Sequence, residues 1–103
     1  MDRRAYRRVP LVTSIWVRYE NQSEESRAAW DIGEGGLRME RLAAPINSTV
    51  WLVIRIPAKS RQPQGYMLVG RVVWKKINGT GVQFVDPSHQ QLQAIRDYVA
   101  SSG

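Results

Sequence analysis

The strongest constraint on the fold of this chain is an alternation of apolar and polar residues with a period of two. The segment 49–56 shows it most clearly, with a branched aliphatic residue at every second position. These residues are Val50, Leu52, Ile54 and Ile56. Alternation of this kind is typical of a strand with one buried face. The core of the protein is therefore predicted to be a β-sheet.

The same alternation recurs along most of the chain and predicts six strands. Their ranges are about 11–20, 26–32, 36–42, 48–57, 66–77 and 80–85. In the fifth of these, Trp74 falls on the same face as Leu68 and Val72. Turn-forming residues separate the strands and no helical pattern lies between them, which favours an antiparallel barrel or sandwich over a βαβ fold.

Local signals define the connections near the end of the chain. Asn78-Gly79 indicates a hairpin with a type I′ turn, in which both central residues take a positive φ. Asp86 precedes a proline and is predicted to be the N-cap of a helix over about 87–100. The polar stretch 58–65 is predicted to be a mobile loop. The expected fold class is all-β with one C-terminal helix, as a six-stranded antiparallel β-barrel.

The length of 103 residues suits one small stand-alone domain, which we divide into a flexible arm, 1–10, and a barrel domain, 11–103. The chain has no cysteine, so disulfides, thiolate nucleophiles and cysteine-ligated zinc are excluded. No apolar run is long enough for a signal sequence or a membrane span. We expect a cytoplasmic protein without membrane insertion, metal or other cofactor.

The positive charge is concentrated at the N-terminus. The first ten residues hold Arg3, Arg4, Arg7 and Arg8 against Asp2 alone, which is half of the net charge of +6. The planar guanidinium of arginine binds phosphate bidentately and stacks on nucleobases. An anionic partner is therefore expected. The alternative is that a basic terminus only keeps the protein soluble.

The sequence offers little for catalysis. His89 is the single histidine and has no cysteine to act with. Asp31 and Glu34 flank a glycine cluster, but no further residue completes an acid–base pair or a metal site. We predict that the protein is not an enzyme.

Two motifs are more informative about function than these isolated residues. The arginine-rich segment contains Arg-x-x-x-Arg twice, as Arg3/Arg7 and as Arg4/Arg8. The second motif is a glycine turn that an acidic residue opens, Asp31-Ile-Gly-Glu-Gly-Gly36. Taken alone, this turn is interpreted as a tight connection whose glycines supply positive φ values. Those glycines are Gly33, Gly35 and Gly36.

In this order, and within this strand pattern, the two motifs resemble those of the PilZ domain family. That family carries Arg-x-x-x-Arg in an N-terminal arm and Asp/Asn-x-Ser-x-x-Gly between the second and third strands of a six-stranded barrel with a C-terminal helix. The passage from Arg8 to Leu11 looks like the family's entry into the first strand. On this resemblance Arg4 and Arg8 match the motif arginines, and Arg3 and Arg7 are auxiliary.

The resemblance extends to the glycine turn and beyond. Asp31 and Gly36 match the second motif, and Gly35-Gly36-Leu37 is similar to the family's entry into the third strand. The segments 70–74 and 81–84 are similar to its late hairpin. One position departs from the pattern, because Gly33 stands where the motif has serine.

The resemblance implies a bacterial receptor for cyclic di-GMP, a ring of two guanosines joined by two phosphodiesters. Arg4 and Arg8 would bind guanine O6 and N7 or a phosphate. Asp31 would accept from the guanine N1–H and N2–H₂ groups or orient an arginine. The glycine turn would let the backbone approach the ligand, and Trp74 would offer either a stacking surface or a core contact.

Replacement of the motif serine by Gly33 removes one hydroxyl. A lost hydrogen bond costs roughly 0.5–1.5 kcal/mol, so we expect binding to weaken into the micromolar range without disappearing. Gly33→Ser is accordingly expected to tighten binding.

The implied mechanism is a switch. Four arginines on a short segment repel one another, so we expect residues 1–9 to be mobile until the ligand orders them and presents a surface to a downstream protein. Two alternatives remain open at this point. One is a small basic barrel that binds RNA or single-stranded DNA. The other is a PilZ-like protein-interaction scaffold with weakened ligand binding.

Overall fold

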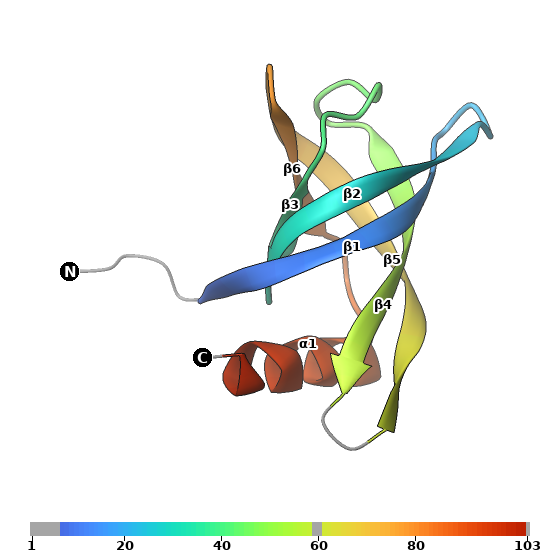
Figure 1. Ribbon diagram of the computed structural model, residues 1–103. Helices are drawn as coiled ribbons and strands as arrows, with labels where there is room; N and C mark the ends of the chain where they lie inside the picture. Colours follow the sequence, from blue (N-terminus) through green and yellow to red (C-terminus); the bar gives the residue numbers. More distant parts are fainter. Residues whose placement is uncertain (1–6, 59–60, 103) are drawn as a thin grey trace.

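The computed structural model describes residues 7–58 and 61–102, which form a closed antiparallel β-barrel and one helix (Figure 1). The elements are β1 (Arg8–Arg18), β2 (Glu24–Gly33), β3 (Gly36–Met39), β4 (Thr49–Ala58), β5 (Arg61–Lys76), β6 (Gly79–Phe84) and α1 (His89–Ser101). The strand order is β1-β2-β3-β6-β5-β4, and pairing of β4 with β1 closes the barrel. The fold class predicted from the sequence is confirmed.

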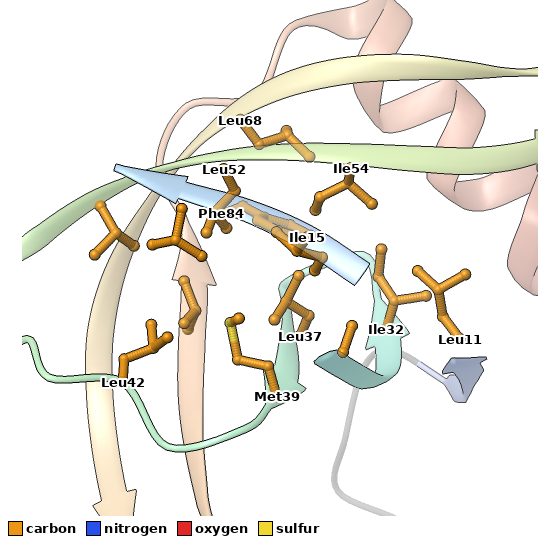
Figure 2. Close-up of a cluster of buried hydrophobic side chains, with 14 of the residues drawn as sticks. Leu11, Ile15, Ile32, Leu37, Met39, Leu42, Leu52, Ile54, Leu68 and Phe84 are labelled. Atoms are coloured by element: carbon orange, nitrogen blue, oxygen red, sulfur yellow. The ribbon is translucent and has the colours of Figure 1, made fainter. Parts of the chain in front are cut away.

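The inward residues of the strands fill the barrel with aliphatic and aromatic side chains (Figure 2). Ile15 of β1, Leu52 of β4 and Leu68 of β5 are almost completely buried and illustrate the predicted alternation. Full burial of one such side chain stabilises the fold by roughly 1.5–3 kcal/mol. Thr80 is the one buried polar side chain among the described residues, and its hydroxyl accepts a hydrogen bond of 2.8 Å from the Leu42 N–H.

Helix α1 lies across the end of the barrel at which β1 begins and β4 ends (Figure 1). Its inner face buries Ile95 and Val99. The Tyr98 hydroxyl donates to the Pro10 carbonyl of β1 at 2.7 Å, and the Gln91 amide donates to the Met67 carbonyl of β5 at 2.6 Å. Within the described part of the chain, no helix is long and apolar enough to cross a membrane.

The helix begins slightly later than predicted, at His89, and Ser88 rather than Asp86 is its N-cap. The Ser88 hydroxyl accepts from the Gln91 N–H, and the Gln91 side-chain oxygen accepts from the Ser88 N–H, both at 3.0 Å. This reciprocal capping box satisfies two backbone donors. Asp86 instead makes the turn before the helix, with a φ of 46°.

The hairpin between β5 and β6 is confirmed, but its predicted turn is wrong. Lys76 pairs with Gly79, so the two connecting residues are Ile77 and Asn78. Described residues with a positive φ lie elsewhere, at Gln22, Asn47 and Asp86. Gly79 is needed for space, because a Cβ there would lie 2.8 Å from the ring of Trp30.

Several strand boundaries also differ from the prediction. Strand β1 already begins at Arg8, which makes this arginine part of the barrel wall. Most of the stretch predicted as a loop, 58–65, is strand, and Gln64 pairs with Ile56. Strand β3 is shorter than expected and ends at Met39.

The close approach of β3 and β6 at Gly36 gives a test of this architecture. A Cβ at Gly36 would lie 2.1 Å from the Val82 carbonyl oxygen, so the two strands would have to separate. We expect Gly36→Ala to lower the free energy of unfolding by about 1–3 kcal/mol or more, measured by chemical denaturation. Gly65→Ala is the matched control, because nothing lies within 4 Å of a Cβ there. Equal stability of Gly36→Ala and the wild type would contradict this packing.

Candidate functional site

Most of the predicted site residues lie on the outer wall of the barrel, in two neighbouring cross-strand rows. The first row consists of Pro10, Asp31, Arg38, Gly81 and Trp74. The second row consists of Arg8, Gly33, Gly36, Gln83 and Arg71. Side chains in register on adjacent strands have Cβ atoms about 4.5–5.5 Å apart. Strand pairing therefore gathers residues that are far apart in the sequence.

Asp31 lies at the centre of this arrangement, between two arginines. Its Oδ1 accepts from Arg8 Nη2 at 2.7 Å and from Arg8 Nε at 3.0 Å, and its Oδ2 lies 2.7 Å from Arg38 Nη2. The Asp31 side chain is 14% exposed, whereas both arginines remain substantially exposed. Since two cations share one carboxylate, the cluster keeps a net positive charge toward solvent.

A groove of about 530 Å³ opens beside this cluster. Arg8 and Arg38 line one part of it, and Trp74 and Gln83 line another. Its floor includes backbone of the glycine turn, since Gly35 and Gly36 also line it. Sites for small molecules usually enclose about 300–1,000 Å³, so the groove is large enough for a ligand of ordinary size.

A β-bulge places Trp74 in this groove. Val72 pairs with Val82, but Trp74 pairs with Gly81, so β5 carries one extra residue at this point. Regular pairing would set Trp74 opposite Thr80 and toward the core, on the same face as Leu68 and Val72. The bulge turns the indole outward over Gly81, at which a Cβ would lie 2.1 Å from Trp74 Nε1.

The glycines of the turn serve a different purpose from the one predicted. No described glycine has a positive φ, so the interpretation of Gly33, Gly35 and Gly36 as left-handed residues is wrong. Gly33 and Gly36 instead let backbones approach closely, because a Cβ at either would meet a carbonyl oxygen. The Gly35 carbonyl accepts from the Phe84 N–H at 2.9 Å, which joins the turn to β6.

The structure brings together Arg8, Asp31, Gly33, Gly35, Gly36 and Trp74 of the predicted set. Arg7 is exposed beside them, and its carbonyl faces Gly33. Arg3 and Arg4 lie outside the described residues.

Arg38 was missed by the sequence analysis. A signal for it existed, since a charged residue two positions after Gly36 on a predicted strand must face the same side as Gly36. What the sequence lacked was the pairing that sets Arg38 directly opposite Asp31.

The two carboxylates considered for acid–base chemistry have separate partners. Asp31 is held by Arg8 and Arg38, whereas Glu34 accepts from Arg96 of α1 at 2.8 Å. Neither arrangement brings them together as a catalytic pair.

A second hollow, of about 460 Å³, lies near the turn between β1 and β2 and has an acidic lining. Glu20, Glu24 and Glu25 contribute to it. Burial, together with the hydrogen bond that its hydroxyl donates to Glu25, raises the pKa of Tyr19 to about 12. The same bond lowers the pKa of Glu25, which favours its charged form. An anionic ligand is therefore better matched to the groove at Arg8 and Arg38.

Comparison with known proteins agrees with this fold. A sequence model of the family described as PilZ domain matches residues 2–101. The inhibitor of motility MotI/DgrA from Bacillus subtilis superposes with a TM-score of 0.84 at 17% identity, over 98% of this chain and 51% of that chain. The present chain thus spans about half the length of MotI/DgrA. A search of curated proteins gave no match.

Two further solved structures share the fold. The PilZ domain of CeSA from a cellulose-synthesizing bacterium has a TM-score of 0.71 at 14% identity, covering 92% of this chain and 96% of that domain. PlzA from Borreliella burgdorferi, solved in complex with c-di-GMP, has a TM-score of 0.68 at 11% identity, covering 95% of this chain and 41% of PlzA.

The packing around Gly33 leads to a prediction about the missing serine. A Cβ at this position would lie 2.8 Å from the Arg7 carbonyl oxygen and 3.3 Å from the Arg8 side chain. Gly33→Ser is therefore expected to lower the folding stability, which the sequence alone did not reveal, in addition to tightening ligand binding. We expect the variant to lose about 1–3 kcal/mol of unfolding free energy without ligand, measured by thermal unfolding. Gly65→Ser should be neutral, and an unchanged Gly33→Ser protein would refute the packing argument.

Proposed function

This chain belongs to the PilZ domain family, and from that premise we propose that it is a receptor for cyclic di-GMP. Domains of this family act as receptors or adaptors rather than as enzymes. The observation that carries the proposal is the convergence of Arg8, Arg38 and Trp74 on one groove, with Asp31 paired to both arginines beside it.

Each of these side chains matches a chemical feature of the ligand. A guanidinium of Arg8 or Arg38 can donate to guanine O6 and N7 or to a phosphate. The Asp31 carboxylate has about four acceptor positions, so it can accept from the guanine N1–H edge while it still holds both arginines. The Trp74 indole offers a surface for base stacking. The Lys76 ammonium lies 5.4 Å from the centroid of that ring and adds positive charge beside it.

The ion pairs of Asp31 also prepare the site for binding. Fixing a long side chain at an interface costs about 0.5–1.5 kcal/mol. Because Asp31 already orients Arg8 and Arg38 toward the groove, much of that ordering precedes the ligand. We infer that Asp31 acts both as a ligand contact and as a positioning residue for the two arginines.

We further propose that ligand binding recruits the N-terminal arginine-rich segment. Strand β1 begins at Arg8, in register with Gly33, so the chain before it starts beside the groove. Arg4, with Arg3 and Arg7 as auxiliaries, would bind the ligand from the side opposite Arg38. The ordered segment would then present a surface to a downstream protein.

Titration of the full chain with cyclic di-GMP in a calorimeter tests the proposed receptor function. We expect saturable binding in the micromolar range, with cyclic di-AMP and GTP much weaker. Cyclic di-AMP lacks the guanine that the arginine and Asp31 contacts would read, and GTP would present only one guanine. A shallow salt dependence is also expected, since the ligand has only two phosphates. No saturable binding, or steeply salt-dependent binding of an oligonucleotide in its place, would overturn the proposal.

Substitutions of the two arginines extend the same titration. Hydrogen bonds to charged groups contribute about 1.5–3 kcal/mol, so Arg8→Ala and Arg38→Ala should each weaken binding roughly tenfold or more. Arg41→Ala is the matched control, because Arg41 is exposed but does not line the groove. Loss of affinity in the control equal to that in Arg38→Ala would remove Arg38 from the site.

Hydrogen exchange tests the recruitment of the N-terminal segment. We expect the backbone amides of residues 1–7 to exchange more slowly when cyclic di-GMP is bound, because the ligand would hold Arg4 beside Arg8. The Arg4→Ala variant should lose this protection. Equal exchange with and without a saturating ligand would refute the switch while leaving the receptor function intact.

A further inference from the structure

The wall formed by β1, β4 and β5 carries a row of exposed apolar side chains. Trp16, Val53 and Met67 are in register across the three strands. Their exposed fractions are 47%, 37% and 56%. Isolated apolar residues are common on surfaces, but a contiguous apolar patch usually marks an interaction site. We call these three residues the apolar row.

The apolar row has arginines on both of its sides. In the next cross-strand row, Arg18 pairs with Trp51 and Trp51 pairs with Val69, and the Arg18 guanidinium lies 6.0 Å from the Trp51 ring centroid. Arg55 borders Val53 on the other side of the row, and Arg71 follows Val69 along the outer face of β5. No salt bridge between described residues uses any of these three arginines.

We propose that this wall is the docking surface for an acidic protein partner. Apolar side chains of the partner would cover the apolar row, and its carboxylates would pair with Arg18, Arg55 and Arg71. Tryptophan, methionine and arginine are the residue types enriched in protein–protein interfaces, and tryptophan and arginine often dominate their energetics. The combination of an apolar centre and a basic rim therefore defines both the contact and the sign of the partner's charge.

This surface is distinct from the cyclic di-GMP groove. The groove is lined mainly by β3 and β6, together with Arg8 of β1 and with Val73 and Trp74 of β5, and none of Trp16, Val53 and Met67 lines it. Arg71 is in register with Gln83 of the groove and marks the border between the two surfaces. The proposal therefore stands independently of the proposed receptor function.

Charge argues against two other occupants of the surface. A second copy of this chain would bring the same arginines toward one another, in a molecule whose net charge is +6. An anionic membrane would face the Glu24 carboxylate, which accepts from Trp16 Nε1 at 3.0 Å at the edge of the row. An acidic protein can leave that carboxylate at the solvated rim.

Selection from a library of random peptides on the immobilised full chain tests the proposal, with Trp16→Ser protein as the counter-selection. Enriched peptides are expected to combine aromatic or aliphatic residues with several Asp or Glu. Synthetic copies of the enriched peptides should bind the wild type at least about tenfold more tightly than they bind the double variant Arg18→Glu/Arg55→Glu or the single variant Met67→Ser. Tenfold corresponds to a difference in binding free energy of about 1.4 kcal/mol. Ile77→Ser is the control, because Ile77 is 90% exposed at the β5–β6 turn, away from the row.

Thermal unfolding of each variant shows whether a loss of peptide binding comes from misfolding. Cyclic di-GMP titration of each variant shows separately whether the groove still binds its proposed ligand. Peptides without acidic residues, no surviving peptide, or affinity that the substitutions leave unchanged would overturn the proposal. Dimers in sedimentation velocity that Trp16→Ser abolishes would assign the surface to a second copy. Cosedimentation with phosphatidylcholine–phosphatidylglycerol vesicles that Trp16→Ser abolishes would assign it to a membrane.

Discussion

Closure of the barrel around a filled interior determines where function can be placed on this protein. The inward side chains of all six strands pack against one another, with Ile15, Leu52 and Leu68 among those that are almost completely buried. A ligand therefore has to be recognised outside the core, and the candidate groove lies on the outer wall. On that wall, residues meet in cross-strand rows, and register decides which side chains are neighbours. A slip of one residue in β3 would turn Arg38 into the core and leave Asp31 with Arg8 alone.

The ion pairs of Asp31 reduce the electrostatic repulsion between the arginines on that outer wall. Arginines that converge on one anionic ligand repel one another while the ligand is absent. The Asp31 carboxylate offsets this repulsion, because it binds Arg8 through one oxygen and Arg38 through the other. It still leaves an excess of positive charge at the groove. One acidic residue between two strands thus makes a cationic site compatible with a stable barrel.

The period-two pattern was sufficient to predict all six strands, because burial of one face is a local property of each strand. It left a barrel and a sandwich open, and the family resemblance favoured the barrel. The glycine turn and Asp31 were predicted from their motif. Trp74 was included in the predicted site as a stacking surface, but its outward orientation could not be derived from the alternation, since it depends on a bulge that appears only when β5 pairs with β6. Arg38 was missed for a related reason, because its partner lies on another strand. The roles of Gly33 and Gly36 depend on how closely neighbouring backbones approach, which φ preferences do not reveal.

Helix α1 has side-chain contacts with elements of both proposed surfaces. Arg96 binds Glu34, which lies inside the glycine turn, and Gln91 donates to the Met67 carbonyl on the strand that carries part of the apolar row. Ile95 and Val99 anchor the same helix in the core. A displacement of the turn would therefore act on a rigid element that also contacts β5. Strands β1 and β5 each carry residues of both surfaces, and α1 adds a further physical connection between the turn and β5.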